Sequence, residues 1–272
     1  MDILSVEIGG RRIVYAAKGT TANPPLLFVH GWGASHQFWI PAMERFHWRF
    51  RCLAPDLPGF GLSDKPGDWD YTVPGWASFL GRFLDVLGYS AVDLTGHSMG
   101  GAASIWFSLH QPERVKRLCV VNPPMRGEDA FYPFARFAIG AAVRRLMYAG
   151  LKAGPIRRWV ARDFTYVAPL PDVLVDDVAR GSYPAMTQPV LFMMKADLTP
   201  RLRELSMPAL LVGTDKDQVI RPRQHDYWPR DGNFRYRLLP ETGHIPMLER
   251  PEEFHRVLSD FLIPAPAEIP VS

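Results

Sequence analysis

The 272-residue sequence has little cysteine, no marked excess of charge of one sign and no long apolar run. Its two cysteines, Cys52 and Cys119, each lie in an apolar segment, which excludes a disulfide framework and predicts small buried side chains. With 31 basic and 28 acidic residues, the net charge of +3 is too small to indicate binding to nucleic acid. Because no apolar run has the length of a membrane span, we expect no stable membrane insertion. Since the first residues lack the basic and apolar regions of a signal peptide, we expect a cytoplasmic protein.

The apolar content of 47% is sufficient for a full core in one large α/β domain. Segments with the character of strands alternate with segments that have a helical period, which is typical of a mostly parallel sheet with helices on both faces. The eight strands are predicted at 3–8, 12–17, 26–30, 50–55, 91–95, 115–122, 209–213 and 234–239. The helices of this part are predicted at 37–46, 74–87, 99–109, 221–228 and 251–262.

The alternation stops between Asn122 and Met207, where apolar residues follow a helical period instead. We therefore predict a core domain made of residues 1–122 and 208–263, with a helical cap insertion at 123–207. Helical segments are expected at 172–180 and 184–195, after an apolar series formed by Phe131, Phe134, Phe137, Ala138, Ala141, Ala142, Leu146, Met147 and Tyr148. The Pro-rich tail at 264–272 is expected to be mobile.

The chemistry is indicated by Gly96-His97-Ser98-Met99-Gly100, which has the form Gly-x-Ser-x-Gly and lies between a predicted strand and a predicted helix. A serine at such a turn is exposed on strained backbone, and the glycines remove side chains that would clash there. Ser98 would also lie at the positive N-terminal end of the helix, where a developing anion is stabilised. Ser98 is therefore the predicted nucleophile.

A serine hydroxyl needs a base within hydrogen-bond reach and a group that orients this base. His244 follows the last predicted strand, at the edge where open α/β sheets place their chemistry. The acid is expected in the loop after the preceding strand, where Asp217 is favoured over Asp215 because of its spacing from the next helix. The remaining histidines with a predicted structural role are His36, His47, His110, His225 and His255. A complete triad needs no metal, and no His-Glu-x-x-His spacing is present, so no metal or other cofactor is expected.

These motifs, together with residues 28–33 and 56–64, resemble those of the α/β-hydrolase fold superfamily, in particular its small cap-bearing serine carboxylesterases and C–C hydrolases. The resemblance covers nearly the whole chain. It implies an oxyanion hole formed by the backbone N–H groups of Trp32 and Met99. It further implies that the residues beside the substrate are His30, Gly31, Gly33 and His97. The loop 56–64 is expected to be scaffold. Similar dehalogenases and epoxide hydrolases carry an aspartate in place of Ser98, so neither activity is expected.

The predicted function is hydrolysis of short-to-medium-chain carboxylic esters through an acyl-enzyme on Ser98. A C–C bond hydrolase that uses the same triad is the first alternative, and a buried arginine facing Ser98 would favour it. A member of the fold that binds a ligand without turnover is the second alternative. The only partner expected is a small-molecule ester, and both a monomer and a dimer remain open. A basic run predicts a solvated cap face, with an acidic substrate or an anionic membrane surface as alternatives: Arg136, Arg144, Arg145, Lys152, Arg157, Arg158 and Arg162.

Overall fold

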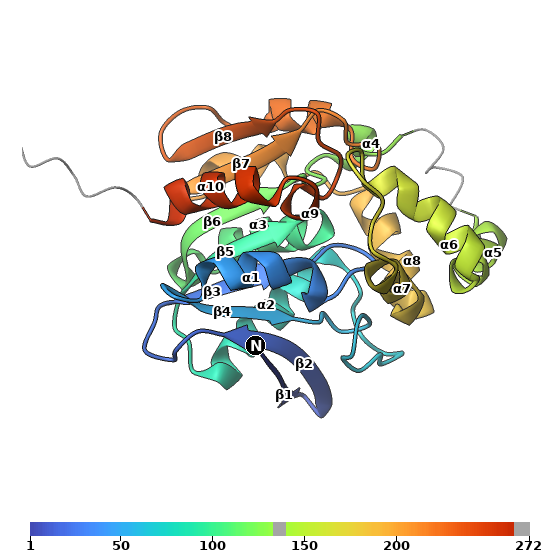
Figure 1. Cartoon of the computed structure of the whole chain (residues 1–272), viewed down its shortest axis with the longest axis horizontal. Helices are drawn as coiled ribbons and strands as arrows, with labels where there is room; N and C mark the ends of the chain where they lie inside the picture. The colour runs from blue at the N-terminus through green and yellow to red at the C-terminus, as the bar shows by residue number, and fades with distance from the viewer. Residues whose placement is uncertain (133–139, 264–272) are drawn as a thin grey trace, which may run out of the picture.

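A computed structural model describes residues 1–132 and 140–263. Its centre is an eight-stranded sheet with the order β1-β2-β4-β3-β5-β6-β7-β8 (Figure 1). Strands β1 and β2 pair antiparallel with each other, β2 pairs antiparallel with β4, and all other neighbours are parallel. The strands are β1 (Asp2–Ile8), β2 (Arg11–Lys18), β3 (Pro25–Val29), β4 (Arg51–Pro55), β5 (Val92–His97), β6 (Val115–Val121), β7 (Ala209–Thr214) and β8 (Phe234–Leu239). The predicted mostly parallel α/β sheet is confirmed.

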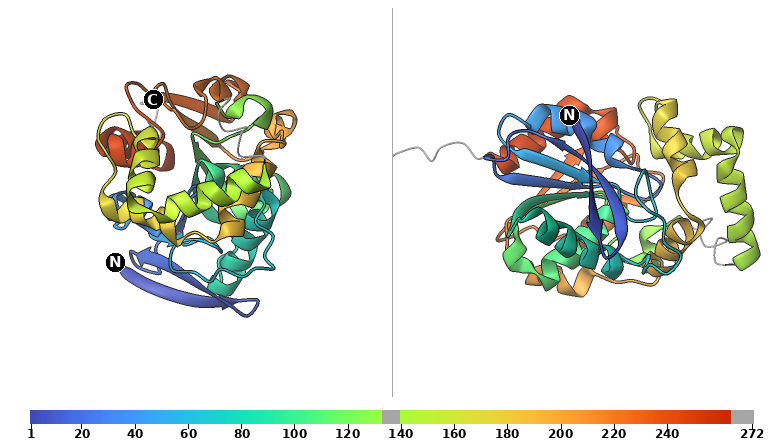
Figure 2. Two further views of the ribbon diagram at one scale, coloured as in Figure 1. Left: turned by 90° about the vertical axis from the view of Figure 1, so that its right-hand side faces the viewer. Right: turned by 90° about the horizontal axis from the view of Figure 1, so that it is seen from below.

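The central strands are buried on both faces, and their alternating side chains supply two separate cores. In β3, Leu27 and Val29 point into one core while Leu26 and Phe28 point into the other. Helices α2 (Val73–Leu87) and α3 (Met99–His110) cover the first face. Helices α1 (Ile40–Phe46), α9 (Pro246–Glu249) and α10 (Pro251–Leu262) cover the second face (Figure 2). Both free cysteines are buried in this second core.

Two predicted helices differ from the structure. The helix predicted at 37–46 is divided into a 3-10 turn (His36–Trp39) and α1, because Pro41 lacks the N–H that a continuous helix requires. The helix predicted at 221–228 is a 3-10 helix (Pro222–Tyr227). There the Gln224 side chain accepts hydrogen bonds from two backbone N–H groups of the segment after β6, at 2.9 and 2.8 Å. A tertiary contact therefore fixes the conformation of this segment.

The helices between β6 and β7 lie beyond the carboxyl ends of the parallel strands (Figures 1 and 2). They are α4 (Gly127–Ala130), α5 (Ala141–Lys152), α6 (Gly154–Ala161), α7 (Asp172–Arg180) and α8 (Tyr183–Met193), with 3-10 helices at Arg162–Phe164 and Thr199–Glu204. We call residues 123–207 the insertion. Helices α5 and α6 lie farther from the sheet than α7 and α8 do. The predictions for Phe134, Phe137 and Ala138, and for the tail 264–272, fall outside the described residues. Within 1–132 and 140–263, no helix combines the length and the apolar character needed to cross a bilayer.

Candidate active site

Ser98 lies at the sharp turn between β5 and α3, with φ 52° and ψ −121°. A non-glycine residue in this region costs about 1–3 kcal/mol and is held there only by its surroundings. The surroundings explain the flanking glycines. A Cβ at Gly96 would lie 2.4 Å from the Ser104 hydroxyl, and one at Gly100 would lie 2.3 Å from the His30 carbonyl oxygen. Close packing around Ser98 therefore requires glycine at positions 96 and 100.

Asp217 and His244 form a buried pair, because Nδ1 of His244 lies 2.7 Å from Oδ2 of Asp217 and both side chains are about 1% exposed. The other carboxylate oxygen of Asp217 accepts the N–H groups of Val219 and Ile220, each at 2.8 Å. A carboxylate that accepts a proton from Nδ1 fixes the imidazole tautomer in which Nε2 is unprotonated. Nε2 of His244 is therefore the ring nitrogen that can accept a proton.

Asp215, the second candidate acid, has a different environment. Its carboxylate accepts the Thr242 N–H at 3.4 Å and lies 3.7 Å from Nζ of Lys216, with a third of the side chain exposed. It supports the turn before His244 and makes no contact with the imidazole among the described residues. The structure therefore pairs Asp217 with His244.

Glu249 holds the His244 loop and is a residue that sequence reasoning missed. Its carboxylate accepts the N–H groups on both sides of His244, those of Gly243 and Ile245, each at 3.1 Å. It also accepts the N–H groups of Tyr166 and Val167, at 2.6 and 3.1 Å. The loop and the insertion therefore share one carboxylate. Nothing in the sequence signals this role, because two of the four donors lie more than 80 positions away.

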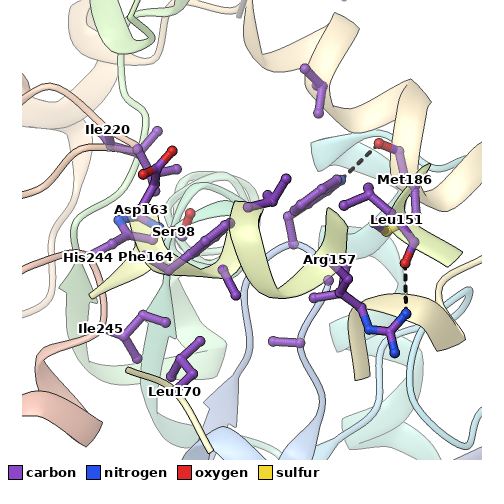
Figure 3. A pocket seen from close by; sticks show the side chains of 18 of the residues that line it. Ser98, Leu151, Arg157, Asp163, Phe164, Leu170, Met186, Ile220, His244 and Ile245 are labelled. Atoms are coloured by element: carbon purple, nitrogen blue, oxygen red, sulfur yellow. Dashed lines mark hydrogen bonds between the residues drawn. The ribbon is translucent and has the colours of Figure 1, made fainter. Parts of the chain in front are cut away.

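Ser98 and His244 line a cavity of about 250 Å³ between the sheet and the insertion (Figure 3). Most of its wall is aliphatic or aromatic, with contributions from α5 to α8: Met147, Tyr148, Leu151, Val160, Ala161, Leu174, Val178, Met186, Val190 and Met193. Figure 3 shows Phe164 and Ile220 near His244, with Leu151 and Met186 at the other end. Such a wall suits an apolar group of a substrate.

Trp32 and Met99, the predicted oxyanion residues, lie on either side of the nucleophile. Trp32 lies in the loop after β3 and lines the cavity, and its indole N–H donates to the Met186 carbonyl at 2.8 Å. Met99 is the first residue of α3, where backbone N–H groups have no partner within the helix. Gly31, the residue before Trp32, packs against Ser98, since a Cβ there would lie 3.1 Å from the Ser98 Cβ. The oxyanion hole itself stays a prediction.

His30 does not line the cavity, so its predicted place beside the substrate is wrong. Its ring is fully buried, with Nε2 2.9 Å from the Leu57 N and Nδ1 2.8 Å from the Gly31 carbonyl oxygen. Burial lowers the pKa of His30 to about 4, so the ring is neutral, accepts at Nε2 and donates at Nδ1. Both ring nitrogens are used to connect backbone segments, which leaves none for a ligand.

The other three predicted substrate residues have different positions. Gly31 lies behind the cavity wall, where a Cβ would come within 3.1 Å of the Ser98 Cβ, so this glycine allows close packing and does not itself line the cavity. Gly33 lines the cavity at φ 69°, with Val178 against it. His97 also lines it, and its Nε2 lies 2.9 Å from the His244 carbonyl oxygen. Burial lowers the pKa of His97 well below its usual value, so this neutral ring donates to the loop of the base.

No other histidine lines the cavity in the described part of the chain. His36 is buried, with Nδ1 2.8 Å from Oδ1 of Asp56. Burial lowers the pKa of His225 to about 4. Among residues 1–132 and 140–263, no cluster of three or more His, Cys, Asp or Glu side chains could hold a metal ion. The charged side chains that line the cavity are Arg144, Arg157 and Asp163.

A sheet of this order, with a strained serine after β5 and a buried acid–histidine pair after β7 and β8, defines an α/β hydrolase. The model of the alpha/beta hydrolase family matches residues 26–257, and the chain belongs to this family. It is 29% identical to 2-hydroxy-6-oxo-2,4-heptadienoate hydrolase of Pseudomonas putida, over 96% of this chain and 99% of that protein. It is 26% identical to Lipase 1 of Psychrobacter immobilis, over 93% and 81% of the two chains.

Solved structures agree on the fold. A membrane phospholipase A described as a bacterial virulence factor superposes with a TM-score of 0.82 at 27% identity, over 96% of this chain and 85% of that one. A thermophilic esterase from Thermogutta terrifontis superposes with a TM-score of 0.79 at 22% identity, over 96% and 98% of the two chains. The relatives include esterases, lipases and C–C bond hydrolases, so the family alone does not determine the substrate.

Proposed function

We propose that this protein is a serine carboxylesterase that cleaves short-to-medium-chain esters and uses the insertion as a cap over the substrate. The observation that carries the proposal is that Ser98 and the Asp217–His244 pair meet at one predominantly apolar cavity of about 250 Å³. An apolar acyl group gains free energy by leaving water for such a wall. The lipase and esterase relatives support ester hydrolysis as the class of reaction.

In the first half of the reaction, Nε2 of His244 takes the Ser98 proton while Oγ attacks the ester carbonyl. Asp217 stabilises the imidazolium that forms. The N–H groups of Met99 and Trp32 hold the oxyanion, and each such donor contributes about 3 kcal/mol to the transition state. The alcohol leaves with the proton from His244, and Ser98 keeps the acyl group as an ester.

In the second half, a water molecule gives its proton to His244 and attacks the acyl carbonyl. The acid then leaves as the proton returns to Ser98 Oγ, which restores the enzyme. His97 supports both halves as a positioning residue, because its ring joins the position before Ser98 to the carbonyl of the base.

A C–C bond hydrolase remains the second candidate, because a relative over nearly the whole chain is a heptadienoate hydrolase. A dienoate brings a carboxylate, which calls for a cation facing the nucleophile. Arg144 and Arg157 both line the cavity. The guanidinium of Arg157 donates to the carbonyls of Leu151 and Lys152 and to Asp176. Figure 3 shows it at the opposite end from Ser98. The partners and position of Arg157 thus make it unavailable as the cation for a dienoate carboxylate.

The test is the rate of hydrolysis across p-nitrophenyl esters from acetate to palmitate, for the wild type and Ser98→Ala. Ser90→Ala is the matched control, because Ser90 is exposed and precedes β5, whereas Ser98 follows this strand. We expect a maximum at short or medium chains, a loss of about 10⁴-fold or more in kcat/KM for Ser98→Ala, and no change for Ser90→Ala.

Activity that survives in Ser98→Ala would refute Ser98 as the nucleophile. A wild type that is inactive on every ester but cleaves a 2-hydroxy-6-oxo-dienoate would establish the C–C hydrolase instead. Thermal stabilisation by an ester analogue without turnover of either substrate would indicate a ligand-binding member of the fold.

A further inference from the structure

The outer side of helices α5 and α6 exposes large apolar side chains. Of the 15 large apolar or aromatic side chains that are strongly exposed in the described part of the chain, eight fall within residues 143–173. Five of them lie on α5 and α6 and form what we call the apolar patch: Val143, Leu146, Met147, Ile156 and Trp159. Leu146 is 75% exposed and Trp159 is 65% exposed. This concentration marks an interaction surface.

The patch is continuous across the two helices. Val143, Leu146 and Met147 are spaced by three and four positions, and Ile156 and Trp159 by three, so each set lies on one helical face. Gly150 lies at the contact between these faces, where a Cβ would come 3.3 Å from Cγ2 of Ile156. Met147 also lines the cavity, together with Tyr148, Leu151 and Val160 of the same helices. The patch is therefore continuous with the wall of the cavity and extends from it to the solvent-exposed surface.

Within the segment that carries the patch, all charged side chains are positive. Residues 141–162 carry six cations and no carboxylate, while the whole chain has a net charge of +3, so the rest of the chain has a net charge of −3. Arg157 and Arg158 pair with Asp176 and Asp172 of α7. The ammonium of Lys152 donates to the carbonyls of Ala179 and Gly181. Among the described residues, no carboxylate pairs with Arg145 or Arg162, which are exposed in the same segment as the patch.

We propose that the apolar patch and its flanking cations dock this protein reversibly on an anionic phospholipid bilayer. Exposed apolar and aromatic side chains framed by Lys and Arg are the features of helices that lie in the plane of a membrane interface. Trp159 supplies the aromatic anchor that such interfaces favour. The rest of the chain has a net negative charge and is repelled by the anionic bilayer. This repulsion orients the molecule with α5 and α6 toward the lipid.

A second copy of this chain is a poorer occupant of the patch. A twofold dimer brings the same surface of both copies together, and here it would place two sets of unneutralised cations against each other. An anionic lipid surface provides both the apolar layer and the opposite charge. Docking there sets the outer wall of the cavity against the membrane, and this inference does not depend on which ester the enzyme cleaves.

The experiment is co-sedimentation with vesicles of phosphatidylcholine alone and with added phosphatidylglycerol, using Ser98→Ala protein so that lipid is not consumed. The patch variant is Trp159→Ser with Arg162→Gln. The matched control is Trp48→Ser with Arg49→Gln, because Trp48 is also an exposed tryptophan, at 60%, beside an exposed arginine, and both lie outside the insertion. Thermal unfolding of each variant verifies that it is folded.

We expect binding to the anionic vesicles, little binding to neutral ones, and weaker binding at high salt. The patch variant should lose about tenfold or more in partitioning, since one interfacial cation alone corresponds to about fivefold. The control should bind like the parent. Equal binding to both vesicles, equal loss in both variants, or no binding to anionic vesicles would overturn the proposal. A dimer in sedimentation velocity that the patch variant dissociates would also overturn it, in favour of a second copy.

Discussion

The sheet and the insertion contribute to one cavity by different means. The sheet side supplies Ser98, Asp217 and His244, which stand at the ends of β5, β7 and β8 and are held by backbone hydrogen bonds and close glycine packing. The insertion supplies a wall of aliphatic and aromatic side chains from α5 to α8. Reaction geometry requires particular residues at particular backbone angles, whereas an apolar wall needs only volume and low polarity. In the proposed function, chemistry and substrate choice are therefore divided between these two parts of the molecule.

The largest expected effect tests the sheet side. Asp217→Asn should lower kcat by about 10⁴-fold, because an amide cannot hold His244 in the required tautomer. Asp215→Asn, two positions away and without contact to the imidazole among the described residues, should change kcat less than about threefold. The profile of ester chain lengths should stay the same in both variants. Steady-state kinetics on the preferred p-nitrophenyl ester tests this, and a comparable loss for Asp215→Asn would contradict the assignment of the acid.

An intermediate effect is expected where the two parts meet, at Glu249. In the wild type, the two carboxylate oxygens of Glu249 accept four backbone N–H groups, whereas Glu249→Gln leaves one acceptor oxygen for them. The His244 loop and residues 166–167 should therefore shift. We expect kcat to fall by about 10- to 100-fold and the free energy of unfolding to drop by about 1–3 kcal/mol.

The control for Glu249→Gln is Glu253→Gln, because Glu253 lies four positions further on and its Oε1 lies 3.6 Å from Nη1 of Arg250. It should leave kcat and stability unchanged. Kinetics and denaturant unfolding of both variants provide the measurement. If Glu249→Gln retains full kcat with lowered stability, the carboxylate supports the fold without positioning the base.

The smallest effect concerns two neighbouring acids of α7. Asp177 is buried and accepts hydrogen bonds from Ser35 and Gln37, and burial raises its pKa above the ordinary 3.8. The folded state then binds more protons than the unfolded chain, so the contribution of Asp177 to stability falls as the pH rises through this range. Asp176 is exposed, and its hydrogen bond to Arg157 lowers its pKa, so its contribution falls as the pH drops.

The two amide variants should therefore change stability in opposite directions with pH. Relative to the wild type, Asp177→Asn should gain about 2 °C in Tm between about pH 4 and pH 7. Asp176→Asn should lose Tm relative to the wild type as the pH rises toward about pH 4, because a carboxylate with a lowered pKa becomes charged below the ordinary 3.8. This loss should be smaller because the pair is solvent-screened. Differential scanning fluorimetry from about pH 2 to pH 7 measures both slopes. Slopes of the same sign would contradict the assigned environments.

The sequence predicts the sheet side well because its constraints are local. Helix α10 begins and ends where its pattern predicts, and all eight strands lie within two residues of the predicted bounds. Ser98 is recognisable because the strained turn requires glycines at fixed positions. The place of His30 next to the glycines of residues 31–33 does not reveal that both of its ring nitrogens bind backbone groups. Glu249 and Gln224 act on distant backbone N–H groups, which no local pattern encodes.

Glu249 also has a practical consequence for exchanging parts between members of this family. A graft that replaces α5 and α6 to obtain a new substrate range keeps His244 in position only if residues 164–167 are retained. The Phe164 carbonyl accepts the His244 N–H, and Glu249 accepts the N–H groups of Tyr166 and Val167. The natural splice points are therefore before Ala141 and after Ala161, ahead of this tether. Chimeras cut between Phe164 and Val167 would exchange specificity and disable turnover at once.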